Sequence, residues 1–196
     1  MSNVVKSKRQ ETRFEAGHNL IKLHDEITKM CFNRFGFSAI KAEKNREKYI
    51  QQHQNIPNLD EIIQRYDEKI EAFNTWFIDR ECDKIMDIFD NLSTEFTLGN
   101  STYPSNVSLL MEYLGRRKHM NNAIGWCYRL RDEVNYVART IAADKNKYKN
   151  ISELIDRQIK LIKGVRQSDN RFLRNLKNTK LEIKDVINYL FANELT

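Results

Sequence analysis

Two clusters of basic residues are the part of this sequence most suited to chemistry, and that chemistry is the binding of phosphate groups. The first cluster is three consecutive residues, and the second lies in a later segment. Their members are Arg116, Arg117 and Lys118, and Lys163, Arg166, Arg171, Arg174 and Lys177. Such side chains neutralise phosphates and release counterions, which gives affinity for nucleic acid without reading its sequence. The clusters therefore predict a nucleic-acid interface. The alternative is that they only keep a helical protein soluble.

The chain also begins with a basic segment, which forms either a solvated end or an arm that touches phosphates. Its members are Lys6, Lys8, Arg9 and Arg13. Two aromatic residues between the clusters, Trp126 and Tyr128, flank Cys127 and could stack on bases. A place in the core or in a subunit contact is the more common use of such residues.

Catalysis has one candidate pattern. Arg13 and His18 fit Arg-x4-His, and Arg46 and His53 fit Arg-x6-His. This spacing resembles all-helical ribonucleases of the higher-eukaryote-and-prokaryote nucleotide-binding type, in which the pair flanks the scissile phosphate. The motif is short and arises easily by chance among 33 basic residues. Phe14 also stands where a polar residue usually follows the arginine. A helical ribonuclease using Arg13 and His18 therefore stays an alternative.

Other catalytic and metal-binding patterns are weak or missing in the sequence. Asp79, Asp83 and Asp87 recur every four residues and line one side of a helix, but no histidine stands at ligand spacing from them. The sequence has no Gly-rich phosphate loop and no Gly-x-Ser-x-Gly nucleophile motif. We therefore predict no enzyme, no metal site and no cofactor.

Composition favours an all-helical protein. The 196 residues include only 6 Gly and 2 Pro, while 31% are charged, 40% are hydrophobic and the formal net charge is +6. Three cysteines, too few and too scattered for a disulfide framework, suggest buried free thiols. The N-terminal segment is charged where a signal peptide needs an apolar core, and no apolar run approaches the ~20 residues that span a bilayer. The expected location is the cytoplasm.

A helical hairpin carries the two basic clusters. Its first helix has an apolar stripe at alternating steps of three and four, formed by Met120, Ala123, Cys127, Leu130, Val134, Val137 and Ile141. Its second helix has an apolar face formed by Ile151, Leu154, Ile155, Ile159, Leu161 and Ile162. If these helices run antiparallel, the two clusters meet at one end of the hairpin.

The remaining elements complete an antiparallel four-helix bundle over residues 1–172. A first helix is expected over 11–35, ended by Gly36, and a long helix from Asn58 to a loop at 99–106. The long helix has an acidic exposed side formed by Asp60, Glu61, Asp67, Glu68, Glu71, Asp79, Glu81, Asp83, Asp87 and Asp90. The mostly polar composition of an insertion at about 38–56 predicts a peripheral helix. Residues 173–196 read as a basic C-terminal extension with one short helix.

Several stretches of the chain together resemble a known family. They are SKRQETRFEAGHNLIKLHDEITKMCFNRFGFS, GNSTYPSN, AIGWCYRLRDEVNYV and DKNKYKNISELIDRQIKLIKGVRQSDNRF. They are similar to the accessory variability determinants, the four-helix-bundle accessory proteins of diversity-generating retroelements, which are relatives of the proteins encoded by intervening sequences of 23S ribosomal RNA genes. The likeness is one of pattern, spread over most of residues 4–172.

The resemblance implies a function without catalysis. Proteins of this family assemble into a pentameric ring with a positively charged surface, and they bind nucleic acid and the reverse transcriptase of the element during mutagenic copying of template RNA into cDNA. By this resemblance the expected partners are a reverse transcriptase, RNA or cDNA, and further copies of the chain. The insertion and the C-terminal extension exceed a minimal bundle of the family. A helical scaffold that binds only protein, through the acidic long helix, is a further alternative.

Overall fold

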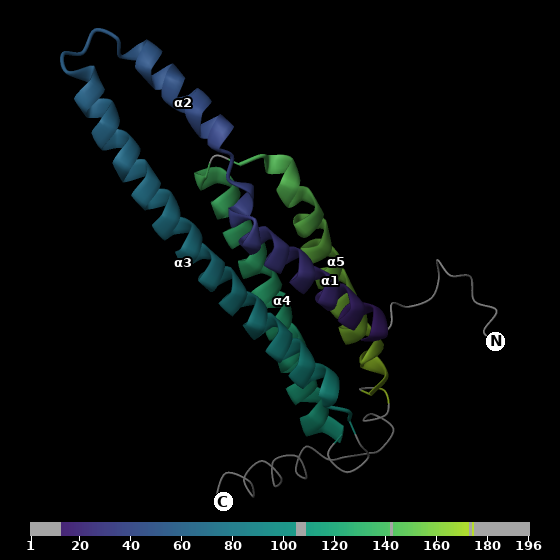
Figure 1. Ribbon diagram of the computed structural model, residues 1–196. Helices are drawn as coiled ribbons and strands as arrows, with labels where there is room; N and C mark the ends of the chain where they lie inside the picture. The colour runs from purple at the N-terminus through teal and green to yellow at the C-terminus, as the bar shows by residue number, and fades with distance from the viewer. Residues whose placement is uncertain (1–12, 105–108, 142, 173, 175–196) are drawn as a thin grey trace, which may run out of the picture.

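The computed structural model describes residues 13–104, 109–141, 143–172 and 174, and this part of the chain is all-helical, as predicted (Figure 1). Its elements are α1 (Arg13–Phe32), η2 (Arg34–Gly36), α2 (Ala39–Gln52), α3 (Leu59–Ser101), α4 (Leu109–Thr140), η3 (Lys145–Tyr148) and α5 (Lys149–Ser168). No helix within the described residues has a stretch both long and apolar enough to cross a membrane. Lys6, Lys8, Arg9, Lys177 and the predicted C-terminal helix lie outside the described residues.

Helices α1, α3, α4 and α5 enclose one hydrophobic core. Helix α3 packs along α4, α1 packs against α5 and α3, and α4 packs against α5 (Figure 1). The predicted stripe of α4, from Met120 to Ile141, is buried along its whole length. The predicted face of α5 is buried as well, apart from the half-buried Leu154. Period-3.6 patterning therefore identified the core faces of both helices.

Helices α4 and α5 run antiparallel. Arg116 near the start of α4 contacts Asp169 just after α5, whereas Arg131 further along α4 contacts Asp156 near the start of α5, at 3.4 Å. The reversed order of these contacts fixes the direction of the hairpin. It also places the start of α4 beside the end of α5.

The corner after α1 differs from the expected helix end. Helix α1 stops at Phe32 rather than continuing to residue 35, and Arg34, Phe35 and Gly36 then all take positive φ angles of 49°, 56° and 67°. Left-handed backbone is costly for Phe35, so tertiary contacts must hold it. Its ring is buried, and the hydroxyl of Tyr148 donates a 2.7 Å hydrogen bond to its carbonyl.

The predicted peripheral helix is confirmed as α2. Its N-cap is Ser38, whose hydroxyl accepts a hydrogen bond from the backbone N–H of Lys41 at 3.3 Å. No residue of α2 is buried. The helix leans on the first turns of α3 through the Arg46–Asp67 ion pair at 2.8 Å and the stacked rings of Tyr49 and Tyr66. The two helices therefore form an arm that projects beyond α1, α4 and α5 (Figure 1).

Helix α3 departs from the sequence prediction at both ends. The helix is expected to begin at Asn58 but begins at Leu59, because Asn58 has a φ of 59° and its side chain makes no capping bond. At the other end the helix continues to Ser101 and includes Gly99, where a loop was expected to begin. A Cβ at Gly99 would lie 3.1 Å from Cε of Met120, so this glycine serves the close approach of α3 to α4.

Candidate nucleic-acid interface

The first predicted basic cluster lies beside the residues that follow α5, whereas Lys163 of the second cluster lies further along α4, beside Tyr128. Arg117, in α4, has one guanidinium nitrogen 3.5 Å from the side-chain oxygen of Asn170, which follows α5. The same nitrogen donates to the hydroxyl of Tyr113 at 2.9 Å, which steadies this half-buried side chain. Lys118 beside it is exposed. The antiparallel packing of α4 and α5 therefore brings the first cluster next to the end of α5.

Arg116 is not an interface residue, which corrects the sequence prediction. Its side chain is 0% exposed and forms a buried ion pair with Asp169. It also donates hydrogen bonds to the backbone carbonyls of Gly99 and Thr102. These contacts tie the ends of α3 and α5 to the start of α4, so Arg116 is a structural group that a polyanion cannot reach.

The second cluster is more accessible. Lys163, Arg171 and Arg174 are exposed. The ammonium of Lys163 lies 3.2 Å from the hydroxyl of Tyr128, and the guanidinium of Arg171 lies 5.0 Å from the ring centre of Phe172. Arg166 is only half-buried, and its Nε is enclosed without a hydrogen-bond partner among the described residues. The exposed members leave their charged groups available to phosphate.

Sequence reasoning underrated the surface around Tyr128. This ring is exposed, with the guanidinium of Arg131 at 5.0 Å and the ammonium of Lys163 at 5.8 Å from its centre. An aromatic ring beside cations can stack on a base while the cations bind phosphates. Trp126 is half-buried and packs against the core, as was expected of both aromatic residues. Tyr128 does not follow this expectation. The exposure of Tyr128 could have been predicted from the sequence, because this residue lies off the apolar stripe of α4.

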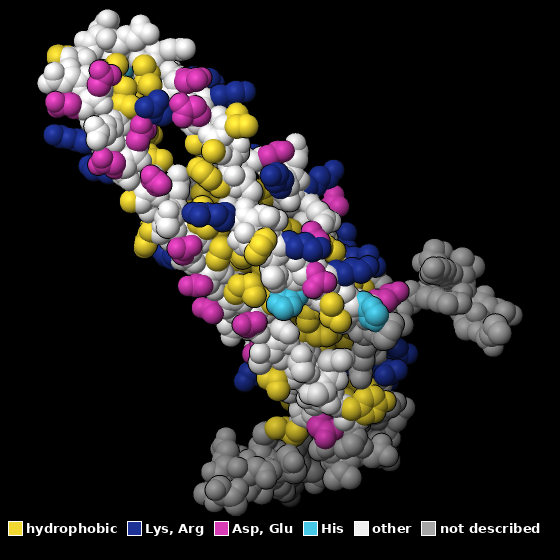
Figure 2. Space-filling model, viewed as in Figure 1, with side chains coloured by type: hydrophobic (Ala, Val, Ile, Leu, Met, Phe, Trp, Pro, Cys, Tyr) yellow, Lys and Arg dark blue, Asp and Glu magenta, His cyan; other side chains and the backbone are white. Residues whose placement is uncertain are grey.

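The predicted acidic side of α3 is largely exposed. Acidic side chains form a row along the α3 edge of the molecule (Figure 2). The side chains of Asp79, Asp83 and Asp87 are exposed, and the described residues include no group of three or more His, Cys, Asp or Glu that could hold a metal ion. A surface of this sign repels phosphate.

Glu81 was also predicted on this exposed side, and that is wrong. It is 0% exposed, and neither carboxylate oxygen has a hydrogen-bond partner within the described chain. Burial raises the pKa of Glu81, and the neighbouring Glu133 carboxyl raises it further, against the opposing charges of Lys84 and Arg80. Lys84 forms its closer ion pair with Glu133, at 2.8 Å. Glu81 is therefore a buried acid in a weakly compensated site.

The structure describes both side chains only for the second Arg–His pair of the ribonuclease alternative. Arg13 is the first residue of α1, and His18 follows five positions later in the same helix and is exposed. In the second pair, Arg46 is bound to Asp67, while the ring of His53 stacks on Tyr49.

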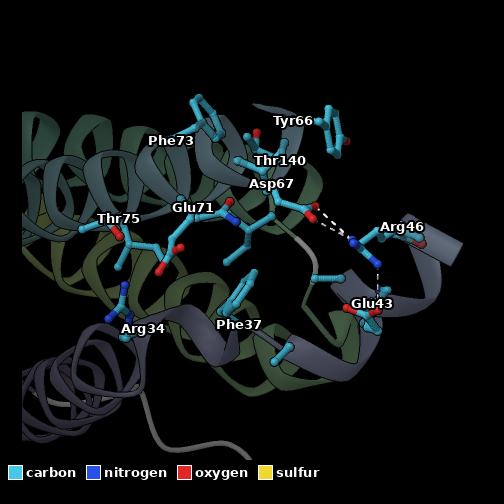
Figure 3. A pocket seen from close by; sticks show the side chains of 18 of the residues that line it. Arg34, Phe37, Glu43, Arg46, Tyr66, Asp67, Glu71, Phe73, Thr75 and Thr140 are labelled. Atoms are coloured by element: carbon cyan, nitrogen blue, oxygen red, sulfur yellow. Dashed lines mark hydrogen bonds and ion pairs between the residues drawn. The ribbon is translucent and has the colours of Figure 1, made fainter. Parts of the chain in front are cut away.

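An open cleft lies at the base of the arm, between α2, α3 and the end of α4 (Figure 3). Its volume is about 910 Å³, and Figure 2 shows an opening between α2 and α3. Apolar side chains line part of it, including Phe37, Ile70 and Phe73, and Arg34 and Glu71 stand at its edge. These residues offer a partly apolar surface for binding.

Comparison of the chain with models of protein families, with curated proteins and with solved structures finds no match. The resemblance to the accessory variability determinants therefore stays a prediction.

Proposed function

We propose that this chain is a non-catalytic nucleic-acid-binding protein that acts as an accessory to a reverse transcriptase. The observation that carries the proposal is the presence of exposed and half-buried cations where α4 begins and just after α5 ends. Arg117 and Lys118 come from one helix, and Arg171 and Arg174 follow the other. A phosphate backbone that crosses this end could contact both groups at once, which gives affinity without base recognition.

The finer parts of the proposal come from the family resemblance. They are an antiparallel four-helix bundle formed by α1, α3, α4 and α5, a homo-oligomer that is a pentamer, and a role in copying template RNA into cDNA. The acidic edge of α3 also supports nucleic-acid binding at the basic end, because a polyanion would be repelled by that edge and attracted to the cations where α4 begins. Measurement of the mass in solution tests the oligomer directly.

A gel-shift experiment with RNA at several salt concentrations tests the binding. The variants Arg117→Glu with Lys118→Glu, and Arg171→Glu with Arg174→Glu, should each weaken binding roughly tenfold or more and flatten the salt dependence. Arg116 is left unchanged, because its loss would damage the fold.

The matched control is Lys44→Glu with Lys48→Glu, which reverses the same number of charges on the exposed face of α2. We expect this control to bind much as the unchanged protein does. Equal binding by all three variants would overturn the proposed interface. RNA cleavage that disappears in His18→Ala would favour the ribonuclease alternative. Capture of a protein partner without RNA, after nuclease treatment, would favour the scaffold.

A further inference from the structure

Two of the three cysteines lie against each other, although they are 51 positions apart in the sequence. Cys31 is in the last turn of α1 and Cys82 is in the middle of α3. Both are half-buried at the edge of the core, whereas Cys127 is fully buried in α4. Small oxidants can therefore reach the first two thiols more easily than the third.

The thiol of Cys82 contacts the backbone of Cys31. The Sγ atom of Cys82 lies 3.8 Å from the backbone oxygen of Cys31. The neighbouring Cys31 thiol lowers the pKa of Cys82, and Cys82 in turn raises the pKa of Cys31. The charge of Arg34 also lowers the pKa of Cys82, whereas burial and the carboxylates of Asp79 and Asp83 raise it. Cys82 is thus the better nucleophile of the two.

We propose that Cys31 and Cys82 form a redox-active thiol pair, which a peroxide converts into a disulfide between α1 and α3. The contact between the sulfur of one residue and the backbone of the other carries the proposal, because a disulfide requires its two residues to be neighbours in space.

The reaction balances with one molecule of hydrogen peroxide. The Cys82 thiolate attacks one oxygen, the O–O bond breaks, and the other oxygen leaves as water once protonated, which makes Cys82 a sulfenic acid. The Cys31 sulfur then attacks the Cys82 sulfur, the S–S bond forms, and the S–O bond breaks with loss of a second water. Two thiols are oxidised, and one peroxide is reduced to two waters.

The disulfide would act at the base of the arm. Arg34 and Ile78, close in sequence to the two cysteines, both line the cleft between α2, α3 and α4. A covalent link between α1 and α3 at this point would fix the wall of the cleft from which the arm extends. The oxidised protein should therefore hold the arm more rigidly than the reduced protein.

The test uses the purified full chain, treated with hydrogen peroxide and then alkylated. We expect the intact mass to fall by two hydrogen atoms, two of the three thiols to resist alkylation, and peptide mapping to find Cys31 joined to Cys82. Cys127→Ser should give the same disulfide, whereas Cys82→Ser should not. Cys31→Ser should accumulate a sulfenic acid on Cys82 that dimedone traps.

A thermal scan gives a second measurement that needs no variant. Closing a loop of this length should raise the Tm of the oxidised protein by about 5–15 °C, and a reductant should reverse the rise. Peptide mapping that finds Cys127 in the disulfide, links only between molecules, or three free thiols after peroxide would each overturn the proposal.

Discussion

Replacement of Arg116 by alanine tests whether this residue holds the fold rather than a nucleic acid. The substitution leaves the carboxylate of Asp169 buried without its guanidinium and removes the donor to the carbonyls of Gly99 and Thr102. Removing one partner of a buried ion pair costs about 3–5 kcal/mol. In a chain of this length each kcal/mol lowers the Tm by about 2–4 °C, so Arg116→Ala should lower it by about 6–20 °C.

Thermal unfolding followed by circular dichroism measures the effect. Lys118→Ala is the matched control, because this side chain is exposed two residues away and its loss should change stability by no more than about 0.5 kcal/mol. The double variant Arg116→Leu with Asp169→Leu should recover much of the loss, because no isolated charge then stays buried. An Arg116→Ala protein as stable as Lys118→Ala would refute the assignment of Arg116 to the interior.

Three further substitutions have effects that follow from contacts in the structure. Glu81→Gln should raise the free energy of unfolding by about 1 kcal/mol at neutral pH. The pKa of Glu81 is raised in the folded protein, so the unchanged protein loses stability as the pH rises from the ordinary carboxyl pKa through the raised one. The stability advantage of Glu81→Gln should therefore vanish in acid, and denaturant titrations at several pH values measure this. Gly99→Leu should cost about 1–3 kcal/mol in the same titration, because its side chain would enter the contact between α3 and α4. Tyr148→Phe should cost about 1 kcal/mol through the lost bond to Phe35, and hydrogen exchange should quicken around that corner.

The helices were predictable because their apolar stripes are long and regular. The stripe of α4 and the face of α5 were found almost residue by residue, and the peripheral position of α2 followed from its polar composition. The corner at residues 34–36 was not predictable. Its left-handed backbone depends on the burial of Phe35 and on a bond from Tyr148, which lies 113 positions away in the sequence.

The site was predicted less well, because every member of a basic cluster was assigned to the interface. Arg116 stands four residues before Met120 and so falls on the extended apolar stripe of α4. Asp169 stands four residues after Val165 on the stripe of α5, and Glu81 stands three after Ile78 on that of α3. A charged residue at a stripe position therefore signals a buried group, and an opposite charge on a facing stripe signals its partner.

The arm formed by α2 and the first part of α3 has a consequence for protein engineering. Between residues 39 and 76 only Ile63 is buried, so the outer part of the arm adds almost nothing to the hydrophobic core. A fluorescent reporter joined within residues 54–57 would stand at the far tip, away from every core contact (Figure 1). Whole helical turns could likewise be removed from α2 and from the facing part of α3 together, which would yield a shorter protein with its interior unchanged.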